Sequence, residues 1–317
     1  MRLCTGLLVL LATSAAFADT SEERALGFLS REVPRWSQEN HCYSCHNNGD
    51  AARALYAAQR LGYQVPPEAL TDTTAWLRRP LEWDSNKGDP NASDKRLARI
   101  QFAAALLEAM GTGIVKDRQL LLDAAEGLVK DQGPTGFWPV EQETDVGSPA
   151  TYGTPLATFM AIRTLRQAEP TRFRPAIEKA EKWMSKLRVE AIVDCAAVLW
   201  AFAGSEDPDT IRVRGEALDI MLRSQNPNGG WGSYPHQPSE AFDTAVAILA
   251  LHAVQPGPAV QYRVDKGRVF LVLRMMTTGS WRETTRPAGS QSYAQRMSTA
   301  GWATYALVET RREGRPR

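Results

Sequence analysis

A short segment that recurs along the chain constrains its fold more than any other feature. Gln132-Gly-Pro-Thr-Gly136-Phe-Trp138 and Gln225-Asn-Pro-Asn-Gly229-Gly-Trp231 share the pattern Q-x-x-x-G-x-W, and Met275-Met-Thr-Thr-Gly279-Ser-Trp281 keeps the glycine and the tryptophan. The tryptophans are 93 and then 50 positions apart, so the first interval is close to twice the second. A degenerate copy should therefore fall within residues 183–189. Repetition at this period indicates stacked supersecondary units.

Between these segments, apolar residues recur every three or four positions, as in Leu97, Ile100, Ala104 and Leu107, which is the period of a helix. Thr20-x-x-Glu23 and Asp207-Pro208 have the residues that begin helices. The pattern predicts twelve helices, at residues 20–38, 49–63, 67–79, 93–111, 117–131, 151–168, 172–187, 190–203, 208–224, 239–254, 259–276 and 291–312.

Alternate predicted helices differ in composition. Those after a glycine-tryptophan segment are rich in small residues, such as Ala241, Ala245 and Ala247, whereas those before it carry charges, such as Arg212 and Glu216. Small residues let inner helices approach one another, and charged residues suit an outer layer that faces water. Six inner and six outer helices predict an all-α (α/α)6 toroid. An open superhelix of the same hairpins is the alternative.

The repeated segments, each followed by a helix of the type Phe242-Asp243-Thr244-Ala245, resemble the QW repeats of the squalene-hopene cyclase and protein prenyltransferase superfamily. That family consists of (α/α)6 toroids. The resemblance covers residues 93–312 through its motifs and the first two hairpins through periodicity alone. It implies that the glutamine and tryptophan of each segment hold helix ends together, so we interpret them as scaffold residues.

The N-terminus predicts export. Arg2, the apolar run Leu7 to Ala12 and the sequence Ala16-Phe17-Ala18 are typical of a signal peptide at residues 1–18, followed by one toroidal domain at residues 19–317. We therefore expect a secreted or periplasmic protein without a transmembrane segment. The net charge of +1 argues against a nucleic-acid partner.

The resemblance implies two kinds of chemistry, and neither motif is complete here. Cyclases of the family protonate an alkene or epoxide with an aspartate on a D-x-D-D-T-A or D-C-T-A-E segment. The nearest matches are Asp194, beside Cys195, and Asp243, in Asp243-Thr244-Ala245, and these are the candidate catalytic acids. The prenyltransferases hold zinc through D-x-C and a histidine. Here Asp194 and Cys195 are adjacent, which directs their side chains about 100° apart on a helix, and His252 is the available histidine.

A second pattern, Cys42-x-x-Cys45-His46, lies where later repeats place their glycine-tryptophan segments, at the rim of the predicted toroid. C-x-x-C-H is the attachment pattern of c-type haem, in which both thiols bond to the haem and the histidine ligates the iron. The sequence predicts covalent haem c at Cys42, Cys45 and His46, with His236 as a candidate sixth ligand. Zinc bound by His41, Cys42, Cys45 and His46, or a Cys42–Cys45 disulfide, are the alternatives.

Three functional hypotheses follow. The first is a haem-bearing toroid that binds an apolar or isoprenoid-like small molecule in its central cavity and exchanges electrons with a redox partner protein. The second is a non-catalytic interaction scaffold in which the cysteine pair forms a disulfide or metal staple. The third is a small terpenoid-cyclase-like enzyme that uses Asp194 or Asp243.

Overall fold

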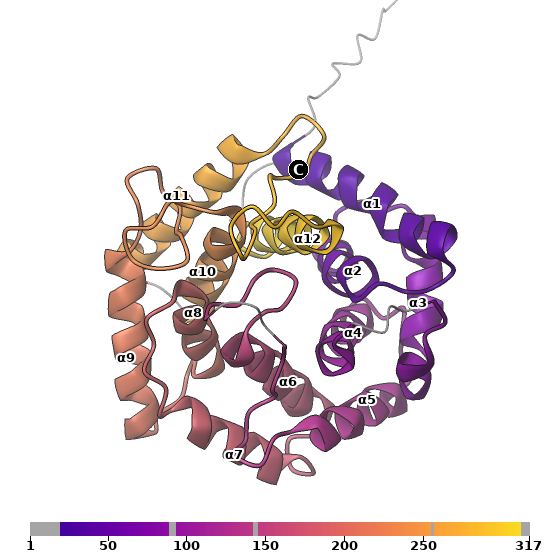
Figure 1. Ribbon diagram of the computed structural model, residues 1–317, viewed down its shortest axis with the longest axis horizontal. Helices are drawn as coiled ribbons and strands as arrows, with labels where there is room; N and C mark the ends of the chain where they lie inside the picture. The colour runs from indigo at the N-terminus through magenta and orange to yellow at the C-terminus, as the bar shows by residue number, and fades with distance from the viewer. Residues whose placement is uncertain (1–19, 89–92, 142–144, 255–256, 312–317) are drawn as a thin grey trace, which may run out of the picture.

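Helices alternate along the chain between an inner and an outer ring (Figure 1). The computed structural model describes residues 20–88, 93–141, 145–254 and 257–311. The inner helices are α2 (Ala52–Arg60), α4 (Lys95–Gly111), α6 (Thr154–Ala168), α8 (Ile192–Ala201), α10 (Ala241–Ala253) and α12 (Tyr293–Glu309). The outer helices are α1 (Ser21–Asn40), α3 (Thr71–Leu77), α5 (Arg118–Asp131), α7 (Arg174–Met184), α9 (Pro208–Arg223) and α11 (Pro258–Arg274).

This arrangement confirms the predicted all-α toroid and its assignment of inner and outer helices. Every residue of α10 from Ala241 to Leu251 is buried, because neighbouring helices cover all of its sides. The outer helix α9 buries only Thr210, Val213, Ala217 and Met221, which lie on one face at helical spacing. Thr20 and Glu23 form the expected capping box of α1, and the Asp207 carboxylate accepts from the first backbone N–H groups of α9.

The structure departs from the predicted helices mainly in the first two hairpins. A π-helical segment, η1 (Cys45–Ala51), precedes α2, so this inner helix begins four residues earlier than expected and with a wider turn. The predicted helix 67–79 is divided into a 3₁₀ turn, η2 (Pro67–Ala69), and α3, and a further 3₁₀ segment, η3 (Pro80–Ser85), follows. Pro80 at the start of η3 lacks the N–H that would be needed to continue α3.

The glycine-tryptophan segments hold outer helices together, as expected for scaffold residues. The Gln225 amide donates to the carbonyl groups of Gly229 (2.8 Å) and Arg263 (2.9 Å), and the Trp231 indole donates to the Met221 carbonyl (2.8 Å). Gly229 has a φ of 89°, and a β-carbon there would collide with the Lys266 carbonyl on the next outer helix. Glycine is therefore required for this close approach.

The third segment closes the ring. Gly279 lies against the Arg24 carbonyl of α1 in the same way that Gly229 lies against Lys266. Arg268 of α11 pairs with Glu22 of α1 at 2.6 Å, and both side chains are largely buried. The last outer helix thus contacts the first, which favours the closed toroid over the open superhelix (Figure 1).

The predicted signal peptide at residues 1–18 lies outside the described residues. Among the residues that are described, no helix combines the length and apolar character that crossing a bilayer would require.

Candidate functional site

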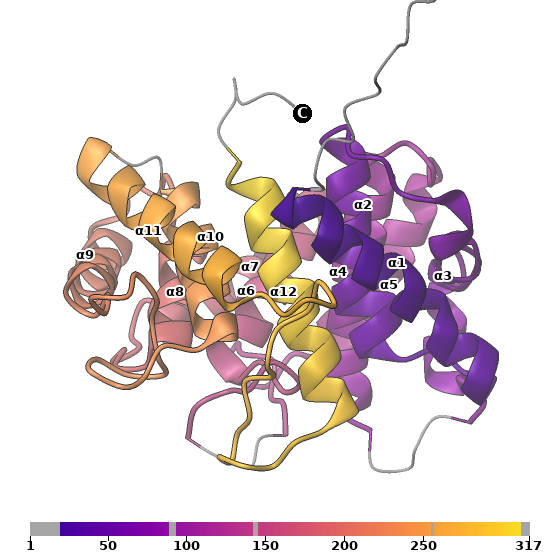
Figure 2. The same cartoon turned by 90° about the horizontal axis from the view of Figure 1, so that it is seen from above.

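The six inner helices begin at the same face of the ring, which we call the mouth. Figure 2 shows the loops that precede α6 and α12 on this face, opposite the C-terminal end of α12. Asp194 lies in the first turn of α8, and Asp243 lies in the first turn of α10. The fold therefore brings both predicted catalytic residues to the mouth.

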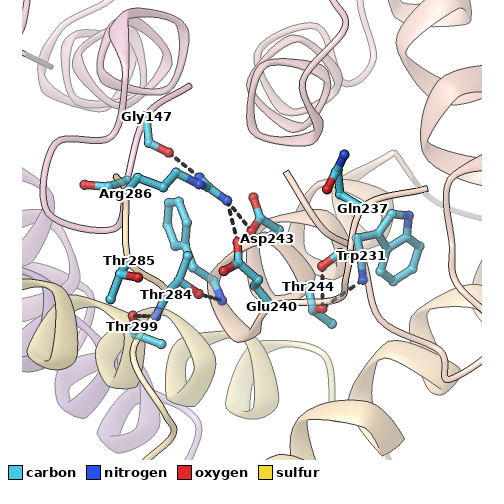
Figure 3. A network of polar contacts seen from close by, with 12 residues as sticks. Gly147, Trp231, Gln237, Glu240, Asp243, Thr244, Thr284, Thr285, Arg286 and Thr299 are labelled. Atoms are coloured by element: carbon cyan, nitrogen blue, oxygen red, sulfur yellow. Dashed lines mark hydrogen bonds and ion pairs between the residues drawn. The ribbon is translucent and has the colours of Figure 1, made fainter. Parts of the chain in front are cut away.

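Arg286, in the loop between α11 and α12, joins three parts of the mouth (Figure 3). Its guanidinium, with only 8% of the side chain exposed, donates to the Glu240 carboxylate at 3.1 Å and to the Asp243 carboxylate. It also donates to the Gly147 carbonyl in the loop before α6. Asp194 lies close enough for the positive charge of Arg286 to lower its pKa. We call Asp194, Glu240, Asp243 and Arg286 the arginine–carboxylate cluster.

Asp243 is fully buried, and its role follows from its partner. One carboxylate oxygen is bonded to Arg286, whereas the other has no hydrogen-bond partner among the described residues. A carboxylate in contact with a guanidinium is stabilised in its ionised form. Asp243 is thus suited to holding Arg286 in place.

Glu240 ends the extended segment before α10 and lies beside both Arg286 and Asp243. Burial and the neighbouring Asp243 carboxylate raise the pKa of Glu240 to about 7, while Arg286 acts in the opposite direction. One guanidinium cannot fully compensate two carboxylates in a poorly hydrated site. Glu240 therefore carries a proton below about pH 7.

Asp194 differs from Asp243 because it remains partly accessible and forms no ion pair with the residues that the structure describes. Burial raises the pKa of Asp194 to about 7, and the charge of Arg286 opposes this shift. Near neutral pH the Asp194 side chain is consequently available as a neutral carboxylic acid. Its conjugate carboxylate would be stabilised by a cation that is already in place.

The hydroxyl group of Thr244, next to Asp243, is hydrogen-bonded to the backbone of the scaffold residue Trp231. Its hydroxyl oxygen accepts from the Trp231 backbone N–H at 3.0 Å, and the hydroxyl donates to the Trp231 carbonyl at 3.3 Å (Figure 3). Asp243-Thr244 therefore fixes the start of α10 to the glycine-tryptophan segment on one side and to Arg286 on the other. This part of the family-like motif has a structural role.

A second polar group, which we call the Asp50 cluster, joins η1 to α4, to the loop before α6 and to α12. The Asp50 carboxylate accepts from Ser298 (2.6 Å), from Gln101 (2.8 Å) and from the Tyr152 hydroxyl. Burial raises the pKa of Asp50, and the nearby charge of Arg53 opposes this effect. The imidazole Nδ1 of His46 lies 3.0 Å from the Ser298 oxygen.

The structure places the C-x-x-C-H residues within packed surroundings. Cys42 is 3% exposed, and its sulfur accepts from the Trp36 indole at 3.3 Å. Cys45 begins η1 and is partly accessible, and burial raises the pKa of its thiol to about 12. Burial also lowers the pKa of His46 to about 4, so its imidazole is neutral near pH 7.

These residues fit a haem only in part. Because Ser298 donates to Asp50, its oxygen accepts from His46 Nδ1–H, which leaves Nε2 unprotonated, as an iron ligand requires. Cys42, however, is covered by Trp36 and by the backbone at Gly88, so as placed it presents no open face to a haem edge. The residues do not fit a haem bonded to both sulfurs in this conformation, and haem c stays a prediction from the motif.

The other predicted metal ligands are not brought together. His236 is exposed in the loop before α10, and in the ring α12 lies between α10 and α2, which carries the His46 segment. No group of three or more histidine, cysteine, aspartate or glutamate side chains in the described part of the chain is placed to hold a metal ion. All three cysteines within it are free thiols.

Aromatic rings from several inner helices pack together inside the ring. Trp302 contacts Tyr152 (5.4 Å between centroids) and Phe242 (5.8 Å), and the guanidinium of Arg53 stacks on it at 3.9 Å. Tyr152, Phe242 and Trp302 are fully buried, whereas Trp200 is partly accessible. Most of these rings therefore form core, and Trp200 is the member available to a ligand.

Sequence reasoning singled out Asp194 and Asp243 but missed Asp50, Glu240 and Arg286. Arg286 and Glu240 lie in loops, and nothing in their local sequence indicates that they meet. Asp50 had a usable signal, since the polar run Asn47-Asn48-Gly49-Asp50 leads directly into an inner helix that is rich in alanine.

Comparison with known proteins supports the fold and leaves the activity open. No family model matches the chain. A segment of 86 residues is 33% identical to drimenyl diphosphate synthase of Streptomyces showdoensis, and this match spans 27% of the chain and 16% of that protein.

Solved structures resemble the chain over most of its length. A variant of the type II terpene cyclase MstE from Scytonema, in complex with geranylgeranyl dihydroxybenzoate, superposes with a TM-score of 0.61, covering 92% of this chain and 96% of that one at 14% identity. ent-Copalyl diphosphate synthase from Streptomyces platensis gives a TM-score of 0.52 at 16% identity, covering 82% of this chain and 50% of that one. A glycosidase gives 0.54 at 13% identity, covering 93% and 99%. The chain thus has the α/α-toroid fold found in type II terpene cyclases.

Proposed function

We propose that this chain is a small terpenoid-cyclase-like enzyme that begins its reaction by protonating a carbon–carbon double bond or an epoxide. The observation that carries the proposal is the position of Asp194 at the mouth, partly accessible and beside Arg286, with a pKa raised to about 7. The terpene-cyclase fold supports the same conclusion. Among the two predicted acids, Asp194 is favoured because Asp243 is held in an ion pair.

In the proposed reaction, burial and charge in the arginine–carboxylate cluster act at different stages of proton transfer. Burial keeps the proton on Asp194 until an isoprenoid chain arrives, and Arg286 then stabilises the carboxylate that remains after transfer. Asp243, Glu240 and the Gly147 carbonyl hold Arg286 in position. The proton adds to the substrate, ring bonds form from its remaining double bonds, and a proton is lost at the end, so the product is an isomer of the substrate.

Product analysis tests this proposal. The protein is incubated with farnesol, geranylgeraniol or squalene, and products are identified by gas chromatography and mass spectrometry. We expect cyclised isomers from the wild type and a loss of about 10²-fold or more in rate for Asp194→Asn, since a general acid contributes about that much. Asp219→Asn, which changes an exposed aspartate on α9, is the matched control and should retain activity. Absence of cyclised product from the wild type, or full activity of Asp194→Asn, would refute the proposal.

The prediction of covalent haem c at Cys42, Cys45 and His46, and with it export to a compartment where haem c is attached, needs a separate measurement. The chain is expressed together with a haem c maturation system, and its absorption is recorded under denaturing conditions. A persistent Soret band supports attachment. Its absence, together with a loss of two thiols on oxidation, supports the alternative of a Cys42–Cys45 disulfide staple.

A further inference from the structure

A pocket of about 440 Å³ opens at the mouth beside the arginine–carboxylate cluster. Its walls come from the loops before α6, α10 and α12, and its polar lining includes Asp145, Ser233, Tyr234, Glu240 and Arg286. The pocket is large enough for the polar end of an isoprenoid compound. The chemistry of its lining therefore bears on which polar end it accepts.

Above about pH 7, where Glu240 is ionised, the charges that line this pocket are predominantly negative. Asp145 is exposed, and 33% of the Glu240 side chain is exposed. Arg286 is the only cation among the described lining residues, and its guanidinium already bonds Glu240, Asp243 and the Gly147 carbonyl. No free cation of the lining remains to neutralise a phosphate group.

The pKa of Tyr234 is affected by the same excess of negative charge. Burial raises the pKa of its phenol, and the nearby carboxylates of Asp145, Asp194 and Glu190 raise it further, while Arg286 lowers it. Negative charge thus reaches the pocket from the loop before α6 and from the start of α8. The pocket offers carboxylate and hydroxyl oxygens, which accept hydrogen bonds from a donor.

We propose that this pocket holds the uncharged, hydroxyl-bearing head group of a non-phosphorylated isoprenoid alcohol, and that Asp145 and Glu240 select against prenyl diphosphates. The inference rests on the proposed function, because it names the class of substrate for the same mouth. A hydroxyl donates to the carboxylates of the lining, whereas a diphosphate would be repelled by them and would find no unoccupied cation.

Binding measurements separate the two head groups. Affinities of the wild type for geranylgeraniol and for geranylgeranyl diphosphate are measured by tryptophan fluorescence near pH 8, at low salt and at roughly 0.3 M salt. We expect the alcohol to bind at least about tenfold more tightly at low salt. The higher salt concentration should reduce this difference in affinity, because it screens the repulsion of the diphosphate and leaves binding of the alcohol unaffected.

Substitutions of the lining carboxylates test which of them weaken the binding of the diphosphate. Asp145→Asn alone, and Asp145→Asn with Glu240→Gln, should tighten diphosphate binding, by about tenfold in the double variant. Because Glu240 contacts Arg286, the exposed Asp145→Asn change gives a readout that does not depend on the cluster remaining intact. Asp219→Asn, on α9, should leave the preference unchanged.

The outcomes distinguish this inference from the proposed function. Diphosphate binding as tight as alcohol binding, or weakened by salt, overturns the inference even where cyclised products form. A preference for the alcohol that persists in Asp194→Asn supports the inference. The same preference without any cyclised product from the wild type supports the head-group site and refutes the cyclase reaction.

Discussion

At Asp194, the requirements of proton transfer oppose the stability of the fold. The folded protein raises the pKa of Asp194 from 3.8 to about 7, mainly through burial. Between roughly pH 4 and pH 7 the folded state therefore keeps a proton that the unfolded chain has released, so stability decreases as the pH rises through this window. Above pH 7 Asp194 is ionised in both the folded and the unfolded state, and its unfavourable contribution to stability stays constant.

Asp194→Asn should remove this dependence on pH. We expect the free energy of unfolding of the variant, minus that of the wild type, to increase from about pH 4 to pH 7 by roughly 3–4 kcal/mol and then to level off. Urea denaturation at several pH values measures this difference. Glu240 and Arg286 titrate or carry charge in both proteins, so their contributions largely cancel.

The matched comparison is Asp219→Asn, in which the altered side chain lies on the surface of α9. The free energy of unfolding of Asp219→Asn, minus that of the wild type, should not rise between pH 4 and pH 7. A flat difference for Asp194→Asn as well would mean that its carboxyl is hydrated in the folded protein, and the case for a neutral acid at the mouth would fail.

Local sequence revealed only part of this site. Asp194 and Asp243 were recognisable because each sits in a short segment that resembles a family motif. Arg286 was not, since its importance arises from contacts with Gly147, Glu240 and Asp243, which are far away along the chain. Such contacts depend on how the ring closes, and a single sequence without coordinates does not specify them.

At the scale of elements, the glycine-tryptophan segments allow a direct measurement of what joins the outer helices. Gln225→Ala removes donors to the Gly229 and Arg263 carbonyl groups and leaves the partly buried Arg263 guanidinium without the Gln225 oxygen. We expect the variant to lose about 1–3 kcal/mol of stability, as for partly buried hydrogen bonds left without a partner. Chemical denaturation provides the value.

Gln119 on α5 supplies the reference for this experiment. It is exposed, and among the described residues its side chain bonds Asp123 within its own helix, so Gln119→Ala should change stability by less than about 0.5 kcal/mol. Equal, small effects of the two substitutions would show that the glutamine of the repeated segment does not hold the outer helices together.

Helical periodicity predicted all twelve helices because each buries a face of small or apolar residues. It missed the π-helical form of η1, which is stabilised by distant partners. Asn47 donates to the Glu32 carbonyl at 2.8 Å, and Asn48 donates to the Thr73 hydroxyl at 2.8 Å. These buried amides stabilise the wide turn through contacts with α1 and α3. Helical periodicity along the chain does not predict such contacts.

For the whole molecule, the repeated segment that closes the ring lacks the glutamine that joins the other two segments to the next outer helix. In the first two, a glutamine amide donates to a carbonyl on the next outer helix, Ala176 or Arg263. Each acceptor lies three residues before the carbonyl that approaches the glycine, Lys179 or Lys266. In the third segment Met275 occupies the glutamine position, and this pair of hydrogen bonds is missing where α11 meets α1.

The same register identifies the acceptors that a restored glutamine would use. The carbonyl that approaches Gly279 belongs to Arg24, so the acceptor three residues earlier is the Ser21 carbonyl at the start of α1. We expect Met275→Gln to donate to Gly279 and Ser21 and to stabilise the protein by about 1 kcal/mol, the net value of such hydrogen bonds. Hydrogen exchange of the α1 amides should slow with it, because opening of the ring at this joint becomes rarer.

Met276→Gln is the control, since Met276 is 39% exposed and its side chain is one position out of register. It should change neither the free energy of unfolding nor exchange in α1. If both substitutions have the same effect, the gain comes from surface polarity and the joint is not the weak point of the toroid. If Met275→Gln alone stabilises the protein and protects α1, closure between the two ends of the chain limits the stability of the ring, and with it the positions of Arg286 and of the carboxylates at the mouth.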